Sequence, residues 1–376
     1  MKKRGHILLG VSLVILSILV VANFALRAND LASGGALLPA GKVIQIKAPL
    51  GLPAVPIPVD NPPTEDTIAL GRRLYYDPSL SVDGTISCAS CHAPEFAFSD
   101  DHSVSSGVGK KTGTRHSPTV INSAYNELQF WDGRAASLEE QAKGPIANPV
   151  EMAHSFDGVV QRLKTDAEYP ELFKKAWGTD QITIDLVAKS IASFERTVIA
   201  GDSAFDRFYY GHNKKALSPA AQRGLKLFTD PKKANCEVCH TIGKTSALFT
   251  DNKFHNLGIG ADTRGNLNDV GRFSQTKRDD DMGCFKTPTL RNLAHRAPLM
   301  HDGSFPTVKD ALGHYIGGGN LNPHLDKQIH ALDFLSFDER DDLLAFLDSL
   351  NGKLPANVGP PPDLAPGPKD GTTAKK

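Results

Sequence analysis

Two short stretches of this sequence share one pattern, and that pattern constrains the chain more than any other feature. Residues 88–92 read Cys-Ala-Ser-Cys-His, and residues 236–240 read Cys-Glu-Val-Cys-His. Two thiols two residues apart with a histidine directly after them form the attachment site of haem c, in which the thiols bond to the porphyrin and the imidazole ligates iron. A zinc ribbon would place its cysteine pairs about 15–20 residues apart, and a thioredoxin-like redox pair needs no histidine. The sequence therefore predicts two covalently bound haem c groups, attached at Cys88, Cys91, Cys236 and Cys239, with His92 and His240 as iron ligands.

Length and composition leave room for two haem domains and argue against some partners. A chain of 376 residues can form two domains that each bury a core. The formal net charge of +0 gives no electrostatic reason to expect nucleic-acid binding. Of the five cysteines only Cys284 lies outside the two motifs, so no disulfide framework can form within the chain. We interpret Cys284 as a small buried hydrophobic residue.

The N-terminus has the layout of an export signal. Basic residues at positions 2–4 precede an uncharged apolar run over residues 7–22, which continues more weakly to residue 28. This layout is typical of a signal peptide or a signal anchor, and no clean cleavage site decides between them. Residues 1–28 therefore predict a periplasmic protein, either released or held at the inner membrane by this segment.

Proline and glycine mark the two ends of the folded body. Residues 29–63 are rich in both and predict an extended tether or a surface strap. Residues 355–376 are proline-rich and end in lysines, which predicts a disordered tail. The body between these segments is expected to begin at residue 64 and to end at residue 354.

The body contains an internal repeat. Helices are expected over residues 64–76 and 218–228, each followed by Asp-Pro and then by a haem motif. Two related haem domains, 64–205 and 206–354, are the simplest explanation of this repeat. The positions that match are Gly71, Leu74, Asp77 and Pro78 in the first copy and Gly224, Leu227, Asp230 and Pro231 in the second.

Two further helices are expected to close these domains. Residues 183–199 are apolar at helical spacing, and residues 336–350 begin with Ser336 and Glu339 in capping-box spacing. Strand signals are few. The predicted fold class is mainly α, with two cytochrome c-like haem domains in tandem and long loops.

The segment between the haem motifs resembles a known family. Residues 130–141, Phe-Trp-Asp-Gly-Arg-Ala-Ala-Ser-Leu-Glu-Glu-Gln, closely resemble the di-haem bacterial cytochrome c peroxidase family, which includes the MauG-type enzymes. The resemblance covers about residues 62–350, and its motifs are too long and too ordered to be generic. The other matching stretches are residues 115–119, 144–146, 148–152, 254–258, 287–292 and 301–303.

The resemblance implies that the haem on His92 is the peroxidatic one and that Glu151 is its distal acid–base residue. A carboxylate suits this chemistry, because splitting an O–O bond requires a group that takes a proton from one oxygen and gives it to the other. Gln141 and Pro145 match the companions of Glu151 in the pocket. From the residue type alone, Glu151 would be interpreted as a surface carboxylate like Glu139.

The resemblance also implies that Trp131 lies between the two haems and relays electrons from the His240 haem to the His92 haem. From the residue type alone, Trp131 would be interpreted as a core tryptophan. Trp177 has no motif around it, and we interpret it as packing.

One departure from the family concerns the open face of the first haem. Peroxidases that need reductive activation carry a blocking histidine on the loop ahead of Arg115, and Val108 stands at the matching place here. Unless His102 moves in and binds the iron, the distal coordination position of the first haem should be open. His102 and His116 are otherwise expected to be surface or structural residues.

A second departure concerns the far ligand of the second haem. Tyr315 stands where activation-dependent members have methionine, which resembles the MauG-type arrangement. A phenolate stabilises oxidised iron and lowers the reduction potential, the reverse of methionine. His314 is the neighbouring alternative, and Met282 and Met300 are weaker candidates.

The family also places calcium between the domains, held by an asparagine and by backbone carbonyls. The asparagine position is His116 here, and imidazole is a poor ligand for a hard cation. The carbonyls near Thr287 and Pro288 remain as ligands, so calcium is doubtful.

Three functions follow from these observations. The first is an exported di-haem peroxidase that reduces hydrogen peroxide with electrons from a small cytochrome c or another periplasmic donor. The second is a MauG-like oxidase that uses peroxide to oxidise side chains of a partner protein, which the departures at Val108 and Tyr315 favour. The third is a non-catalytic di-haem electron carrier with both irons blocked.

Overall fold

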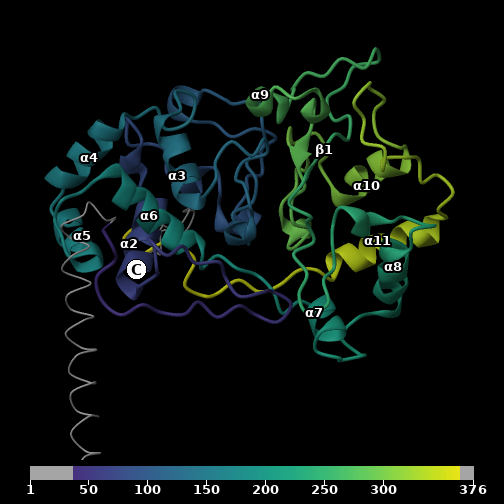
Figure 1. Ribbon diagram of the computed structural model, residues 1–376, viewed down its shortest axis with the longest axis horizontal. Helices are drawn as coiled ribbons and strands as arrows, with labels where there is room; N and C mark the ends of the chain where they lie inside the picture. The colour runs from purple at the N-terminus through teal and green to yellow at the C-terminus, as the bar shows by residue number, and fades with distance from the viewer. Residues whose placement is uncertain (1–36, 365–376) are drawn as a thin grey trace, which may run out of the picture. The chain divides into compact units, whose positions relative to one another are not determined.

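The computed structural model describes residues 37–364, so the predicted export segment, residues 1–28, lies outside the described residues. Helices dominate this range, which confirms the mainly α fold class (Figure 1). Within it, no helix is both long and apolar enough to cross a bilayer. The strands β1 (Phe254–His255) and β2 (Phe285–Lys286) pair antiparallel. The helices are α2 (Glu65–Tyr76), α3 (Leu138–Ala147), α4 (Phe156–Thr165), α5 (Tyr169–Trp177), α6 (Ile184–Glu195), α7 (Ala204–Tyr209), α8 (Pro219–Thr229), α9 (Phe273–Thr276), α10 (Val308–Ile316) and α11 (Phe337–Asp348).

Residues 37–63 form an extended strap without helix, in agreement with their proline content. Leu52 and Val55 are buried in a small apolar cluster with Tyr125. The carbonyl of Gly51 accepts a hydrogen bond of 2.9 Å from the backbone N–H of Ala247. The strap is therefore part of the packed structure along its middle section.

The C-terminal segment differs from the predicted disordered tail. Residues 355–364 lie against the first helices, where Val358 is buried and its carbonyl accepts a hydrogen bond of 2.8 Å from the Tyr76 hydroxyl. Arg72 also donates to the carbonyl of Pro360 at 3.0 Å. Proline content alone suggested disorder, but one buried valine and several backbone acceptors hold this segment in place.

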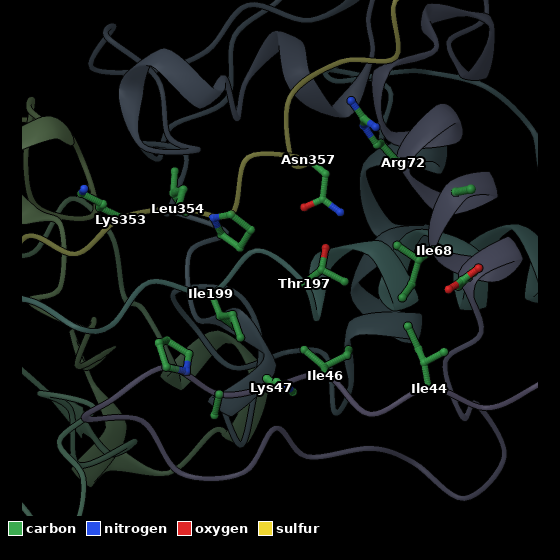
Figure 2. A pocket seen from close by; sticks show the side chains of 15 residues that line it. Ile44, Ile46, Lys47, Ile68, Arg72, Thr197, Ile199, Lys353, Leu354 and Asn357 are labelled. Carbon is green, nitrogen blue, oxygen red and sulfur yellow. The ribbon is translucent and has the colours of Figure 1, made fainter.

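A cavity of about 680 Å³ lies between the strap, α2 and the C-terminal segment (Figure 2). None of the six residues of the two haem motifs predicted to attach or ligate haem lines it. The cavity is therefore separate from both predicted haem sites. Its apolar lining includes Ile44, Ile46, Ile68, Ile199 and Leu354.

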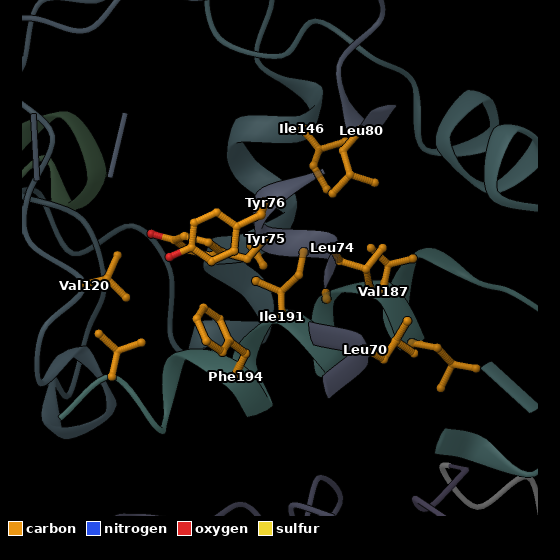
Figure 3. Packing of buried hydrophobic residues seen from close by; sticks show 14 of the residues in the cluster. Leu70, Leu74, Tyr75, Tyr76, Leu80, Val120, Ile146, Val187, Ile191 and Phe194 are labelled. Atoms are coloured by element: carbon orange, nitrogen blue, oxygen red, sulfur yellow. The ribbon is translucent and has the colours of Figure 1, made fainter. Parts of the chain in front are cut away.

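The first hydrophobic core is built where α2 crosses α6. Thr64 caps α2 by accepting from the Thr67 N–H, and the helix ends at Tyr76, directly before Asp77, as predicted. At Gly71 a Cβ atom would lie 1.8 Å from the backbone oxygen of Ser190, so only glycine allows this close crossing. The residues of this core that Figure 3 labels are Leu70, Leu74, Tyr75, Tyr76, Leu80, Val120, Ile146, Val187, Ile191 and Phe194.

The second hydrophobic core repeats that crossing with α8 and α11. At Gly224 a Cβ atom would lie 2.0 Å from the backbone oxygen of Asp342. Phe228 and Phe346 pack with their ring centroids 4.9 Å apart. The match between Gly71 and Gly224 in the sequence is thus a match between two helix crossings.

A buried ion pair ties the strap to this second core. The Arg291 guanidinium donates to both carboxylate oxygens of Asp206 at 2.8 Å, and both side chains are fully buried. Arg291 also donates to the carbonyls of Gly51 and Ala247 at 3.0 and 2.9 Å. One side chain therefore joins α7, the strap and the loop after the second haem motif.

Candidate active site: two haem motifs and the segment between them

The first haem motif lies on a tight turn beside α2. The N–H of His92 donates to the carbonyl of Cys88 at 3.0 Å, and the carbonyl of His92 accepts from the Tyr75 hydroxyl at 2.9 Å. Burial lowers the pKa of His92 to about 4, which keeps the imidazole neutral. Neutral imidazole is the form that ligates iron.

The second haem motif has the same turn. The N–H of His240 donates to the carbonyl of Cys236 at 2.9 Å, and Nδ1 of His240 lies 2.9 Å from the carbonyl oxygen of Phe249. If Nδ1 carries the proton, Nε2 is free to bind a metal. All four motif cysteines are free of disulfides. Two thiols and one neutral imidazole on each turn fit a covalently attached haem.

Glu151 lies in the turn after α3, close to the first motif. The side-chain amide of Asn148 donates to its carboxylate at 2.6 Å. Burial raises the pKa of Glu151. Burial is also the main cause that raises the pKa of the Cys91 thiol to about 11, and the negative charges of Asp100 and Glu151 add to it. Glu151 is therefore a half-buried carboxylate within electrostatic reach of the first haem motif.

Gln141 and Pro145 are one turn apart on α3, so their side chains lie along one face of that helix. The carbonyl of Pro145 accepts hydrogen bonds from the N–H groups of Asn148 and Met152. These bonds close the turn that carries Glu151. The position of Glu151 thus depends on the end of α3.

The loop that contains Val108 packs against the same turn. The N–H of Val108 donates to the carbonyl of Glu151 at 2.8 Å, and a Cβ atom at Gly107 would lie 2.5 Å from that oxygen. His102 is exposed, with Nδ1 within 3.0 Å of Asp100 and 2.8 Å of Asp101. His102, the histidine nearest to Val108 in the sequence, is therefore held at the surface.

His116 is buried, and both of its ring nitrogens have partners. Nε2 lies 3.0 Å from the Ser99 hydroxyl and Nδ1 lies 3.0 Å from the carbonyl of His102. The carbonyl of Thr287 accepts from the Lys286 ammonium at 3.1 Å and from the Thr250 hydroxyl. A neutral ring and a carbonyl already bonded to an ammonium group fit calcium poorly.

Trp131 connects segments that are far apart in the sequence. Its indole N–H donates to the carbonyl of His116 at 2.8 Å, and its own carbonyl accepts from the N–H of Lys286 at 2.8 Å. The indole meets the His301 ring edge to face, with centroids 6.5 Å apart. Trp177, by contrast, is buried in the first core and donates to Ser190 at 2.9 Å.

The neighbours Tyr315 and His314 on α10 face different surroundings. His314 Nε2 lies 2.9 Å from the carbonyl oxygen of Leu257. Tyr315 packs against the second core beside Cys236, and its pKa is raised mainly by burial and then by the charges of Cys236 and Cys239. Tyr315 is thus close enough to the second haem motif for its cysteines to affect the pKa of the phenol.

Arg296 is a buried charged residue that the sequence reasoning did not single out. Its side chain is only 5% exposed, yet it has no acidic partner within residues 37–364. The only signal in the sequence is a charged residue inside the resembling region between residues 287–292 and 301–303. Such a signal does not separate a buried arginine from a surface one.

Comparison with known proteins identifies the family. The family model described as di-haem cytochrome c peroxidase matches residues 65–214, and the cytochrome c model matches residues 221–351. The methylamine utilization protein MauG of Methylorubrum extorquens is 40% identical over 301 residues, which are 80% of this chain and 82% of that protein. Cytochrome c551 peroxidase of Pseudomonas aeruginosa is 36% identical over 299 residues, which are 78% of this chain and 81% of that protein.

A solved structure gives the same result. The crystal structure of a MauG-like protein associated with microbial copper homeostasis aligns with a TM-score of 0.74 and 33% sequence identity, and covers 82% of this chain and 97% of that one. The predicted resemblance, the tandem arrangement and the oxidoreductase class are thereby confirmed. This chain belongs to the di-haem cytochrome c peroxidase family.

Proposed function

We propose that this chain is an exported di-haem peroxidase that reduces hydrogen peroxide to water. The first haem motif serves the peroxide site and the second serves electron entry. When bound, the haems supply the redox-active iron for both roles. The observation that carries this proposal is Glu151, a half-buried carboxylate with a raised pKa beside the first haem motif.

Glu151 acts as the acid–base group. Reduction of one hydrogen peroxide consumes two electrons and two protons and yields two waters. The Glu151 carboxylate takes the proton from one peroxide oxygen and returns it to the other oxygen, which leaves as water. The Asn148 amide orients the carboxylate, and Gln141 and Pro145 shape the pocket from α3.

Trp131 is the relay between the two haem sites in this proposal. Three contacts support that role: its bond to the carbonyl of His116, its bond from the N–H of Lys286 and its edge-to-face contact with His301. The hydrogen bond to His116 and the contact with His301 hold the indole itself, and the bond from Lys286 holds its backbone. An aromatic ring between two redox groups supports transfer by shortening the distance that the electron must cross.

Two observations favour a second candidate, a MauG-like oxidase that uses peroxide to oxidise side chains of a partner protein. Tyr315 packs on the second core within electrostatic reach of Cys236 and Cys239. Val108 stands where activation-dependent peroxidases carry a blocking histidine. A tyrosinate ligand lowers the reduction potential, which makes electron uptake from small cytochromes unfavourable.

The remaining assignments follow from the sequence. Residues 1–28 direct export to the periplasm and are either cleaved or kept as an inner-membrane anchor. The peroxidatic domain comprises residues 64–205 and the electron-transfer domain residues 206–354. The electron source is a small cytochrome c or another periplasmic donor, and in the second candidate the partner is a protein substrate. Calcium has no part in either proposal.

One experiment separates the candidates. Stoichiometric hydrogen peroxide is added to the oxidised holoprotein, the Soret spectrum is recorded, and reduced small cytochrome c is then supplied. Rapid oxidation of the cytochrome supports the peroxidase, whereas a long-lived spectral change that ignores the cytochrome supports the MauG-like oxidase. No spectral response to peroxide would overturn both and leave the electron carrier.

A further inference from the structure

Arg296 is a buried cation without a counter-charge. Its Nε atom is buried and has no hydrogen-bond partner among residues 37–364, and its Nη2 atom donates to the carbonyl of Thr289 at 2.6 Å. Burying a guanidinium with a single neutral acceptor is strongly unfavourable unless an anion completes the site. The side chain therefore requires an anionic partner.

The surroundings show where that anion belongs. Thr289, whose carbonyl accepts from Arg296, donates from its hydroxyl to the carbonyl of Leu248 at 2.7 Å, and the next carbonyl along the chain, that of Phe249, lies 2.9 Å from Nδ1 of His240. The charge of Arg296 also adds to the lowering of the pKa of His116, which is caused mainly by burial. Arg296 is thus connected through Thr289 to the segment that holds the predicted axial ligand of the second haem. It also lies near His116, whose carbonyl holds the Trp131 indole.

Arg296 differs from two other buried groups in the second half of the chain. Lys286 is buried with its ammonium on the carbonyl of Thr287, two residues before the carbonyl that Arg296 uses. His301 is 4% exposed, and its Nε2 atom is buried without a hydrogen-bond partner within residues 37–364. The charges of Asp251 and Glu127 reach Lys286, and those of Asp302 and Asp269 reach His301. Among the described residues no carboxylate reaches Arg296 in the same way.

We infer that Arg296 binds a propionate of the haem attached at Cys236 and Cys239, and that this ion pair sets the reduction potential of that haem. The inference rests on the haem attachment proposed above. A haem brings its own carboxylates into the protein, and a guanidinium fork matches a carboxylate in shape and charge. Arg296 is a positioning residue in this scheme, because it acts on the iron through the propionate.

The electrostatic consequence has a definite sign. A paired propionate carries little net charge toward the iron, whereas an unpaired carboxylate stabilises oxidised iron and lowers the potential. An unpaired carboxylate also takes up a proton more readily as the pH falls, which makes the potential depend on pH. Arg296 is thus expected to hold the second potential high and insensitive to pH.

The test is a spectroelectrochemical titration of the purified holoprotein with Arg296→Gln. We expect the potential of the second haem to fall by about 59 mV or more, a tenfold change in the ratio of oxidised to reduced haem for one electron. It should also become pH-dependent between about pH 5 and pH 8. The matched control is Arg264→Gln, which removes an exposed arginine from the same half of the chain and should shift neither haem.

Arg296→Lys is a second variant in case Arg296→Gln fails to fold. Lysine keeps the positive charge but lacks the planar guanidinium group that binds both carboxylate oxygens. We expect it to shift the propionate bending band in the resonance Raman spectrum, while haem content stays at two per chain. An unchanged band, or a potential that moves only at the first haem, would overturn the assignment. The potential and the Raman band are measured without peroxide. A protein without peroxidase activity would therefore contradict the proposed function but would leave this inference open to the same test.

Discussion

The side-chain amide of Asn148 donates a hydrogen bond of 2.6 Å to the carboxylate of Glu151. Two effects on the pKa of Glu151 oppose each other: burial raises this pKa, and the hydrogen bond from the Asn148 amide lowers it. The carboxylate is thereby made more basic by its surroundings without losing the partner that favours its ionised form. This balance suits a group that must accept a proton and then release it.

Replacing Glu151 with Gln should leave haem content unchanged and slow peroxide turnover about 100-fold or more, because glutamine cannot carry a proton between oxygens. Steady-state turnover with hydrogen peroxide measures the effect. Glu171→Gln is the matched control, since Glu171 is exposed on α5. Turnover in Glu151→Gln at the level of that control would remove Glu151 from the mechanism.

Replacing Asn148 with Ala should move the acid limb of the pH–rate profile to higher pH. The sign follows from the hydrogen bond: without the donor the ionised carboxylate is less favoured, so the pKa of Glu151 rises further. The ionised fraction then appears only at higher pH. A profile of kcat/KM against pH tests this, and an unshifted acid limb would show that Glu151 does not act as the base.

Replacing Asp206 with Asn should destabilise the holoprotein by about 3–5 kcal/mol, because it leaves the Arg291 guanidinium buried and unpaired. Thermal melting followed by circular dichroism measures this loss. Asp202→Asn is the control, since it breaks a pair of similar length, 2.8 Å to Arg207, at the surface. Exposed pairs contribute little. Equal losses in both variants would contradict the structural role assigned to the buried pair.

Replacing Gly71 or Gly224 with Ala should each cost about 1–3 kcal/mol or more, because the new methyl group would overlap backbone at a helix crossing. Denaturant unfolding of the holoprotein checks both variants. Gly313→Ala is the comparison within a helix, because a Cβ atom there meets nothing within 4 Å. That variant should gain up to about 1 kcal/mol from helix propensity. A neutral Gly71→Ala would mean that α2 and α6 can separate freely.

Replacing Tyr315 with Met should raise the reduction potential of the second haem, because a neutral thioether stabilises oxidised iron less than a phenolate does. Potentiometric titration monitored by absorbance measures the change. His314→Gln should leave the potential and the spectrum as they are, since His314 is bound to the carbonyl of Leu257. The opposite result, with only the His314 variant altered, would transfer the ligand role to His314.

Local patterns predicted the helices well. Capping residues and Asp-Pro breaks placed α2 and α8 within one or two residues of their observed ends, and the Ser336–Glu339 capping box starts α11 as expected. The predicted helix over residues 183–199 instead ends at Glu195, because the apolar spacing continues into a turn in which Ile199 is buried. The periodic spacing of apolar residues indicates which positions are buried, and here the buried positions continue beyond the end of the helix.

Long-range pairing could not be predicted in this way. The sequence pointed to the haem motifs, Glu151 and Trp131 because each of them stands in a short motif of contiguous residues. The Arg291–Asp206 pair joins residues 85 positions apart, and nothing in the local sequence encodes it. The same limit explains the C-terminal segment, whose proline content hid the contact between Tyr76 and Val358.

That last contact has a consequence for biosynthesis. Val358 is synthesised 282 positions after Tyr76, although both belong to the same core. The first core therefore lacks one of its buried residues until the segments that form the second core have been made.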